Sequence, residues 1–369
     1  MQFIDLKTQY ARIKDKVDSS IMQVLEHGKY VFGPEITELE DQLAKYTGRN
    51  YCLACSSGTD ALLIPLMAWE IGRGDAVFTT PFTFVATAEV ISLTGATPVF
   101  IDIDKDTYNI DAELLEIAIK KVISEGKLNA KAIIPVDLFG LPADYDAIID
   151  IAKKYNLKIL EDGAQGFGGS YKGKKVCHFG EAAGTSFFPA KPLGAYGDGG
   201  AAFTDDEELF EIFQSIRVHG YGGQRYDNVR LGINGRMDSI QAAVLLAKLE
   251  IFDEEIELRN KVAKRYSQGL KNKVVIPKVP VGYESAWAQY SVLAENSNHR
   301  QEIQDKLKEA NIPSAIYYPI PLHLQTAYQY LAYKKGDMPI TENISERIFS
   351  LPMHPYLKDK EIDEICDII

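Results

Sequence analysis

The 369-residue sequence has few cysteines and no long hydrophobic run. No apolar stretch approaches the roughly 18 residues that a membrane-spanning helix needs. The opening residues, MQFIDLKTQYARIKDK, also lack the apolar core of a signal peptide. We therefore expect a cytoplasmic protein with no membrane partner.

Basic residues are outnumbered by acidic ones. The chain has 40 lysines and arginines against 52 aspartates and glutamates, which gives a net charge of −12. This balance disfavours nucleic acid as the main partner, because binding to a phosphate backbone needs a basic surface. Hydrophobic residues make up 46% and charged residues 25%, so the chain has ordinary globular composition and is neither collagen-like nor wholly disordered.

The four cysteines are too few and too scattered for a disulfide framework in a chain of this length. Cys52 and Cys55 form a C-x-x-C pair, which could be redox-active or half of a zinc site. No second pair follows at the spacing of a zinc finger. Because residues 51–55 also have the pattern of a short apolar strand, we favour two small buried side chains.

Between residues 50 and 205, short apolar runs alternate with helix-length amphipathic stretches. This alternation is typical of βα units around a mainly parallel sheet. The expected strands are 51–55, 75–79, 97–101, 131–135, 157–161, 185–188 and 200–204. The expected helices are 59–70, 84–93, 145–155, and 112–123 with Asp111 as its N-cap. The pattern predicts a layered α/β domain.

Residues 237–270 have helical periodicity and no glycine or proline before Gly269, so we expect one long helix or two abutting helices there. Pro277, Pro280 and Gly282 then mark a boundary. We predict a large domain over residues 1–270 and a smaller C-terminal domain over residues 271–369.

The expected chemistry lies at the carboxyl ends of the strands, where open α/β sheets bind ligands. After strand 51–55 comes SSGTDAL, a small-residue turn that opens a helix and could bind an anion such as phosphate or could simply cap the helix. After strand 157–161 comes EDGAQ, which places a carboxylate at the strand tip. A metal is disfavoured because no histidine is nearby before His178, and a dinucleotide fingerprint fails because its third glycine would fall on Tyr171.

Two further segments follow strands. In SFFPAKPLGAYGDGG, Lys191 stands between two prolines, and desolvation by two phenylalanines would lower its pKa and favour a neutral amine that forms a Schiff base. An ordinary surface lysine is the alternative. In PFTFVAT, an aromatic residue could cover a flat cofactor or belong to the core. A lysine, an acid, an anion site and apolar faces together meet the needs of pyridoxal phosphate.

The segments SSGTDAL, TPFTFVAT, EDGAQ, SFFPAKPLGAYGDGG and RLGINGRMDSIQAAVL resemble the DegT/DnrJ/EryC1/StrS family of sugar-nucleotide aminotransferases. The likeness extends from FIDLK at residues 3–7 to LPMHPYL at 351–357. It implies the aspartate aminotransferase type I fold, with a large domain and a small C-terminal α+β domain. It also implies pyridoxal 5′-phosphate as cofactor and a homodimer whose active sites lie at the subunit interface.

The resemblance implies a role for each matching residue. Lys191 would bind the cofactor covalently, and Asp162 would pair with its ring nitrogen. The remaining cofactor contacts implied are Gln165 at the 3-hydroxyl, Phe84 and Ala164 on the two ring faces, and Gly58, Thr59 and Ser186 at the phosphate, joined by Asn234 of the partner subunit. The substrate contacts implied are Arg236, Tyr317, Tyr318, His323, Lys7 and Tyr30. The aromatic strand with His323 could equally be packing.

The details FIDLKTQYARIKDKVD, KLEIFDEEIELRNKVA and LPMHPYL are most similar to enzymes that aminate C3 of UDP-2-acetamido-2-deoxy-3-oxo-glucuronate with L-glutamate, in surface polysaccharide synthesis such as that of O-antigen. Sister groups act on UDP-3-keto-N-acetylglucosamine for lipid A or on dTDP-3-keto-6-deoxyhexoses. Arg236 could hold a uronate carboxylate. The uronate enzymes would have histidine where this chain has Tyr317.

Two other classes of function stay open at this stage. One is a non-catalytic regulator that binds pyridoxal phosphate or a sugar nucleotide, although neither terminus has spare basic length for a DNA-binding segment. The other is a metal- or NAD-dependent enzyme, which the ligand spacing and the broken glycine fingerprint disfavour.

Overall fold

The computed structural model describes residues 1–224 and 226–369. Its centre is a seven-stranded sheet in the order β1-β9-β8-β5-β4-β2-β3. Its strands are β1 (Tyr51–Cys55), β2 (Asp75–Thr79), β3 (Thr97–Phe100), β4 (Asn129–Ile133), β5 (Lys158–Asp162), β8 (Ala182–Ser186) and β9 (Gly200–Thr204). Only β9 runs antiparallel to its neighbours β1 and β8, and the other pairs are parallel. The predicted mainly parallel α/β sheet is confirmed.

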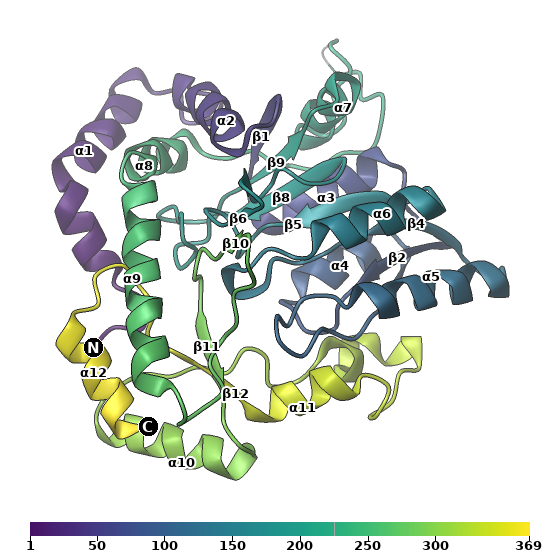
Figure 1. The fold of residues 1–369 in the computed structure, drawn as a ribbon. Coiled ribbons are helices and arrows are strands. Elements are labelled where there is room, and N and C mark those ends of the chain that lie inside the picture. Colours follow the sequence, from purple (N-terminus) through teal and green to yellow (C-terminus); the bar gives the residue numbers. More distant parts are fainter. Residues whose placement is uncertain (225) are drawn as a thin grey trace.

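Helices cover both faces of the sheet (Figure 1). One face packs against α3 (Gly58–Ala68), α4 (Ala86–Leu93) and α7 (Glu207–Arg217). The other face packs against α5 (Ala112–Glu125) and α6 (Tyr145–Tyr155) near β4 and β2, and against α2 (Pro34–Thr47) and α8 (Ser239–Leu249) near β1 and β9. The first helix, α1 (Leu6–His27), lies against α8 through Val17 and Val244. The sheet is therefore buried on both sides, as its apolar strands require.

Local sequence accounts for several boundaries. Asp111 Oδ1 accepts the N–H of Leu114 at 2.9 Å and caps α5 as expected. The bounds of β1, β2, β9 and α6 are those that the pattern predicts. Strand β4 ends at Ile133 rather than at residue 135, because Pro135 has no N–H to offer a neighbouring strand.

Residues 237–270 form two abutting helices, α8 and α9 (Phe252–Leu270), which is one of the two expected arrangements. The chain then continues through β10 (Tyr283–Glu284), β11 (Tyr290–Leu293), α10 (Ser297–Glu309), α11 (Pro339–Arg347), β12 (Ile348–Leu351) and α12 (Asp359–Ile368). Val262 and Tyr266 of α9 share a core with Tyr290 and Phe349. The second half of α9 thus packs with the C-terminal unit, and the division after residue 270 stays a prediction.

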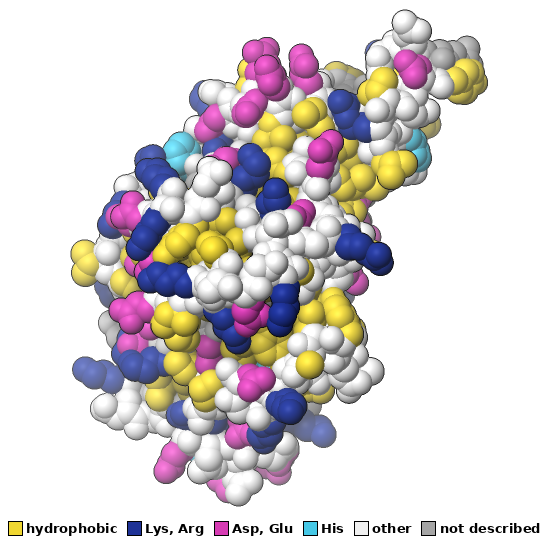
Figure 2. Space-filling view, turned by 90° about the vertical axis from the view of Figure 1, so that its right-hand side faces the viewer, with side chains coloured by type: hydrophobic (Ala, Val, Ile, Leu, Met, Phe, Trp, Pro, Cys, Tyr) yellow, Lys and Arg dark blue, Asp and Glu magenta, His cyan; other side chains and the backbone are white. Residues whose placement is uncertain are grey.

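The remaining elements are short. The paired strands β6 (Ser170–Tyr171) and β7 (Lys174–Lys175) join β10 in a small sheet, and the 3-10 turns are η1 (Leu138–Gly140), η2 (Leu322–Leu324) and η3 (Thr326–Leu331). The described residues between α7 and α8 project from the body of the chain (Figures 1 and 2). Within the described residues, no helix is both long enough and apolar enough to cross a membrane.

The C-x-x-C pair lies inside β1. Both thiols are buried, and burial raises the pKa of Cys52 and of Cys55 above the ordinary thiol value. A buried thiol with a raised pKa is a poor nucleophile and metal ligand. The two cysteines are therefore core residues of the strand, as favoured from the sequence.

Candidate active site

The segments singled out in the sequence follow strands whose carboxyl ends share one edge of the sheet. Strands β2, β5 and β8 are parallel, and β1 has the same direction because both β1 and β8 oppose β9. The parallel sheet thus brings the polar residues after these strands to one edge, where open α/β sheets bind ligands.

Asp162 ends β5 and is 4% exposed. Its Oδ2 accepts the hydroxyl of Thr87 at 2.7 Å, and its Oδ1 accepts the N–H of Ala164 at 3.2 Å. Burial raises the pKa of Asp162, and the two hydrogen bonds oppose that rise. The carboxylate is thus fixed by donors on two sides and is suited to pair with a buried cationic N–H.

Lys191 lies in the turn after β8, where its N–H donates to the carbonyl of Phe188 at 2.8 Å. Burial lowers the pKa of Lys191 to about 8, and the charge of Asp162 opposes this shift only in part. The predicted direction is confirmed. Phe187 is fully buried, but Phe188 is 52% exposed, so the pair does not desolvate the amine as a unit.

The loop that holds Lys191 is fixed from α8 by two residues that the sequence analysis did not single out. Lys248 is 1% exposed, and its Nζ donates to the carbonyl of Gly194 at 2.6 Å. Gln241 Oε1 accepts the N–H of Tyr196 at 2.9 Å. Gln241 lies within the matched segment RLGINGRMDSIQAAVL, and Lys248 lies just after it. These positions were the only indication in the sequence that either residue has a role.

The start of α3 provides an anion site. Ser57 caps the helix by accepting the N–H of Asp60 at 3.1 Å, so the N–H groups of Gly58 and Thr59 have no carbonyl within the helix to bond. A Cβ on Gly58 would lie 2.5 Å from Cβ of Ser186, which shows how closely this turn approaches the end of β8. Free N–H groups and the positive end of a helix favour a phosphate.

Gln165 is occupied by protein partners on both ends of its amide. Its Oε1 accepts the N–H of Phe139 at 2.8 Å, and its Nε2 donates to the hydroxyl of Tyr318 at 3.0 Å. Burial raises the pKa of Tyr318, so the phenol stays protonated. Tyr318, an expected substrate contact, is therefore hydrogen-bonded to Gln165, an expected cofactor contact.

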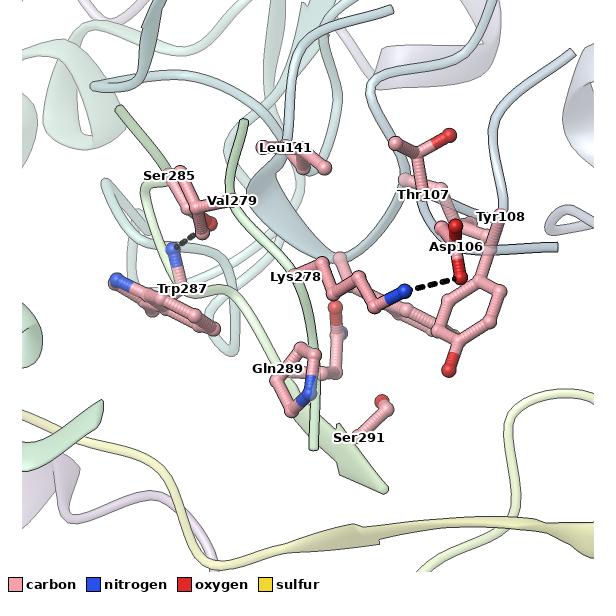
Figure 3. Close-up of a pocket in the computed structure, with 13 residues that line it drawn as sticks. Asp106, Thr107, Tyr108, Leu141, Lys278, Val279, Ser285, Trp287, Gln289 and Ser291 are labelled. Carbon is pink, nitrogen blue, oxygen red and sulfur yellow. Dashed lines mark hydrogen bonds and ion pairs between the residues drawn. The ribbon is translucent and has the colours of Figure 1, made fainter. Parts of the chain in front are cut away.

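A separate small pocket is lined in part by Leu138, Phe139 and Leu141. Its enclosed space is about 20 Å³, roughly the room of one water molecule. Figure 3 shows Lys278 pointing toward Asp106, with Gln289 and Trp287 among the lining residues. The Nζ atom of Lys278 donates to Asp106 Oδ1 at 2.7 Å. This space is too small for a cofactor or a sugar nucleotide.

The two expected ring contacts differ in exposure. Phe84 is 55% exposed. Its carbonyl accepts the N–H of Thr87 at 3.3 Å, and the hydroxyl of the same Thr87 contacts Asp162. Ala164 is partly buried beside Asp162. The exposed ring of Phe84, on the same turn as Thr87, leaves apolar surface for a flat group to cover.

Of the other expected substrate contacts, Tyr317 joins this group, because its ring lies 5.8 Å from that of Tyr318 between centroids. Within the described residues, no contact joins His323, Lys7 or Tyr30 to it. His323 is fully buried at its ring, with Nε2 3.1 Å from Glu342 Oε1, which fits the packing alternative better than a sugar contact. Tyr317 packs edge-on against Phe3. Lys7 and Tyr30 are exposed near the two ends of α1. Their roles stay predictions.

Asn234 and Arg236 lie on a segment beside the anion site. The carbonyl of Gly235 accepts the N–H of Ser56 at 3.0 Å, directly before α3. The side chain of Asn234 is exposed, and that of Arg236 is half-buried. Within residues 1–224 and 226–369, the Arg236 guanidinium has neither an ion pair nor a hydrogen-bond partner.

These residues fit pyridoxal phosphate. The carboxylate of Asp162, held by two donors, can accept a hydrogen bond from a ring N–H. The first turn of α3 offers unpaired N–H groups to a phosphate. The amine of Lys191, with its lowered pKa, suits bonding to an aldehyde. Three separate features of the edge thus match three parts of one cofactor.

Comparison with known proteins agrees with this chemistry. The DegT/DnrJ/EryC1/StrS aminotransferase family matches residues 11–369. A UDP-2-acetamido-2-deoxy-3-oxo-D-glucuronate aminotransferase of Pseudomonas aeruginosa is 51% identical over 99% of this chain and 98% of its own length.

Two solved structures extend the comparison. A DegT DnrJ EryC1 StrS aminotransferase from Brucella abortus is 51% identical, covers 100% of this chain and 98% of its own, and superposes with a TM-score of 0.97. The PLP form of a sugar aminotransferase from Streptococcus pneumoniae is 30% identical over 96% of this chain and 94% of its own, with a TM-score of 0.88. The chain belongs to the DegT/DnrJ/EryC1/StrS family and is a pyridoxal-phosphate-dependent aminotransferase.

Proposed function

We propose that this enzyme transfers the amino group of L-glutamate to the C3 ketone of UDP-2-acetamido-2-deoxy-3-oxo-glucuronate. The observation that carries the proposal is the 51% identity to the Pseudomonas aeruginosa aminotransferase, which extends over almost the full length of both chains. The other acceptors considered are the 3-keto form of UDP-N-acetylglucosamine and a dTDP-3-keto-6-deoxyhexose, neither of which has a carboxylate.

In this proposal each residue of the edge has one task. Bound pyridoxal phosphate supplies an aldehyde that takes up the amino group and a ring that accepts electrons. Asp162 keeps the proton on the ring nitrogen, and Thr87 keeps Asp162 in place. The Nζ atom of Lys191 would take a proton from the carbon that bears the amino group and deliver it to the carbon on the other side of that nitrogen. The first turn of α3 and Ser186 bind the phosphate.

Arg236 is the proposed contact for the substrate carboxylate. Its guanidinium has no acidic partner within the described residues, and its neighbour Gly235 is bonded to the residue that precedes the anion site. A free guanidinium binds a carboxylate through two parallel N–H donors. The hexose acceptors would leave this cation without a partner.

A homodimer with shared sites is part of the proposal. Tyr30, Val31 and Phe32 are each between 43% and 50% exposed, and Val31 pairs with Asp238 two residues beyond Arg236. Exposed apolar side chains in such a row are typical of an interaction surface. This surface would place Asn234 within reach of the second subunit's phosphate site. We further propose a cytoplasmic role in making surface polysaccharides, such as the O-antigen of lipopolysaccharide.

The test is isotope transfer in purified enzyme loaded with pyridoxal phosphate. With ¹⁵N-labelled L-glutamate and the 3-oxo uronate made in the same tube by a dehydrogenase, the label should appear on C3 of the UDP sugar by NMR. A reverse assay, which starts from the 3-amino uronate and 2-oxoglutarate, avoids the unstable ketone and should release glutamate. The proposal is wrong if neither direction proceeds while one of the hexose acceptors is aminated.

A further inference from the structure

Two carboxyl side chains lie directly behind Asp162 and have no role in the chemistry above. Glu161 is the preceding residue of β5, and Asp137 follows β4 on the neighbouring parallel strand, where Val136 pairs with Asp162. Both side chains are 0% exposed. Burying two acids side by side is costly unless hydrogen bonds and protons compensate their charge.

The oxygens of Glu161 are satisfied by the backbone. Oε1 accepts the N–H of Cys177 at 2.6 Å, and Oε2 accepts the N–H of Phe179 at 2.7 Å. Arg49 donates to the carbonyls of Cys177 and Phe179 at 2.9 and 2.6 Å, so its positive charge lies beside the same loop. All of these groups stabilise an ionised Glu161.

Asp137 has one satisfied oxygen and one that faces another acceptor. Its Oδ1 accepts the N–H of Ala143 at 2.9 Å and the hydroxyl of Tyr145 at 2.7 Å. Its Oδ2 is buried, and no donor of residues 1–224 and 226–369 reaches it. The Glu161 carboxyl lies on the neighbouring strand β5, and burial together with its negative charge raises the pKa of Asp137. Two carboxyl groups hydrogen-bond only when one carries a proton.

The backbone joins this pair to the active site. The N–H of Asp137 donates to the carbonyl of Asp162 at 3.0 Å, and the N–H of Asp162 donates to the carbonyl of Pro135 at 2.9 Å. Gly166, next to Gln165, approaches so closely that an added Cβ would lie 2.5 Å from Cβ of Asp137. A displacement of Asp137 would therefore move the residues on either side of the ring-nitrogen contact.

We propose that Asp137 is a positioning residue that keeps its proton at neutral pH, donates it to ionised Glu161 and thereby fixes the backbone of Asp162. This inference rests on the role proposed for Asp162 and adds a neutral acid in the layer behind it. The titratable and charged groups that face the pair are Tyr145 from α6, Cys177 from the loop after β7, and Arg49 from the loop before β1.

The proton gives the site a pH dependence of known sign. Burial and the charge of Glu161 raise the pKa of Asp137, so the pair keeps one proton to a higher pH than two exposed carboxyl groups would. Because the folded protein binds this proton more tightly than the unfolded chain, its stabilising effect is present at low pH and is lost as pH rises through the folded pKa values. Alkaline pH should therefore loosen the Asp162 strand tip.

The first experiment compares D137N with D137A and with the control D150N, an exposed aspartate of α6. Asparagine can donate its NH₂ to Glu161 while its oxygen still accepts from Ala143 and Tyr145. D137N should therefore keep kcat within about threefold of wild type at pH 7, and its kcat and Tm should fall less between pH 7 and 9. D137A should lose about tenfold or more in kcat, because Glu161 and Tyr145 lose their partner.

Impairment of D137N equal to that of D137A would overturn the proposal, since it would mean that a negative charge is needed at residue 137. An unchanged pH profile in D137N would overturn it as well. Wild-type holoenzyme gives a test that does not depend on the variants folding: infrared spectra with and without ¹³C-labelled aspartate should show a protonated carboxyl band at pH 7 that shifts on labelling. Absence of that band also overturns the proposal. Neither result depends on whether the wild-type enzyme aminates the proposed sugar, which the isotope-transfer assay tests separately.

Discussion

The Nζ atom of Lys248 lies 2.6 Å from the carbonyl oxygen of Gly194, three residues beyond Lys191, the lysine that we propose binds the cofactor. Lys248 is 1% exposed, and burial lowers its pKa to about 8. The ring of Tyr196 lies 4.3 Å from Nζ and provides a second favourable contact for the cation. A costly buried charge is thus used to fix the turn that carries Lys191.

We expect Lys248→Met to lower kcat by roughly 10- to 100-fold, because a shift of about 1 Å in a catalytic group can cost that much. The change in stability should be small, since the methionine fills similar volume and removes the desolvation cost of the charge. Steady-state kinetics and thermal unfolding measure the two effects. Lys264→Met, at an exposed lysine of α9, is the control and should leave both unchanged. A fully active Lys248→Met variant would contradict the role of the contact.

Thr87 should govern cofactor affinity through Asp162. Thr87→Val keeps the shape of the side chain but removes the hydroxyl that donates to Oδ2 at 2.7 Å. Loss of a hydrogen bond to a buried carboxylate costs about 1.5–3 kcal/mol, so the Kd for pyridoxal phosphate should rise roughly 10- to 100-fold. Thr87→Ser retains the hydroxyl and should bind nearly as wild type does. Equal affinities for all three proteins in a fluorescence titration would refute the prediction.

Capture of pyridoxal phosphate by the cofactor-free protein should depend on pH through Lys191. Only the neutral amine attacks the aldehyde, and burial lowers the pKa of Lys191 to about 8. The rate constant should rise about tenfold per pH unit well below pH 8 and level off above it. Stopped-flow absorbance at several pH values measures the curve. A plateau reached only near the ordinary lysine value of 10.5 would show that the amine is not desolvated.

Mixed subunits test whether Asn234 acts on the neighbouring site. Lys191→Ala and Asn234→Asp should each be nearly inactive alone. If Asn234 binds the phosphate of the other subunit, a dimer with one copy of each has one site with Lys191 and Asn234 both intact, and activity returns on mixing under exchange conditions. If Asn234 serves its own chain, no intact site forms and mixing restores nothing. Size-exclusion chromatography of the same samples reports the oligomeric state.

The sheet and its active edge were predictable from local pattern. Apolar runs such as residues 75–79 and 200–204 are bounded by turn residues, and they form β2 and β9 with the expected bounds. Asp162 ends one such run, and Lys191 lies in the turn that follows another, so the parallel arrangement alone brings them to one edge. The matched family segments then indicated which chemistry to expect.

Contacts between distant residues were not predictable in the same way. His323 lies in an aromatic segment typical of a sugar site, but its Nε2 is taken by Glu342, nineteen residues later. Lys248 contacts a carbonyl 54 residues earlier, and Asp137 lies next to Glu161 only because β4 and β5 are neighbours in the sheet. A periodicity shows which face a residue occupies, whereas these partners are fixed only by packing between elements.

The most direct test of the proposed substrate is the ratio of kcat/KM for two acceptors that differ only in the carboxylate, UDP-2-acetamido-2-deoxy-3-oxo-glucuronate and the 3-keto form of UDP-N-acetylglucosamine. We expect the wild type to favour the uronate by about tenfold or more, the value of one charge-assisted contact. Arg236→Gln should lower activity on the uronate and leave the hexose rate nearly unchanged. Equal kcat/KM values for the two acceptors, or a preference for the hexose, would contradict the assignment.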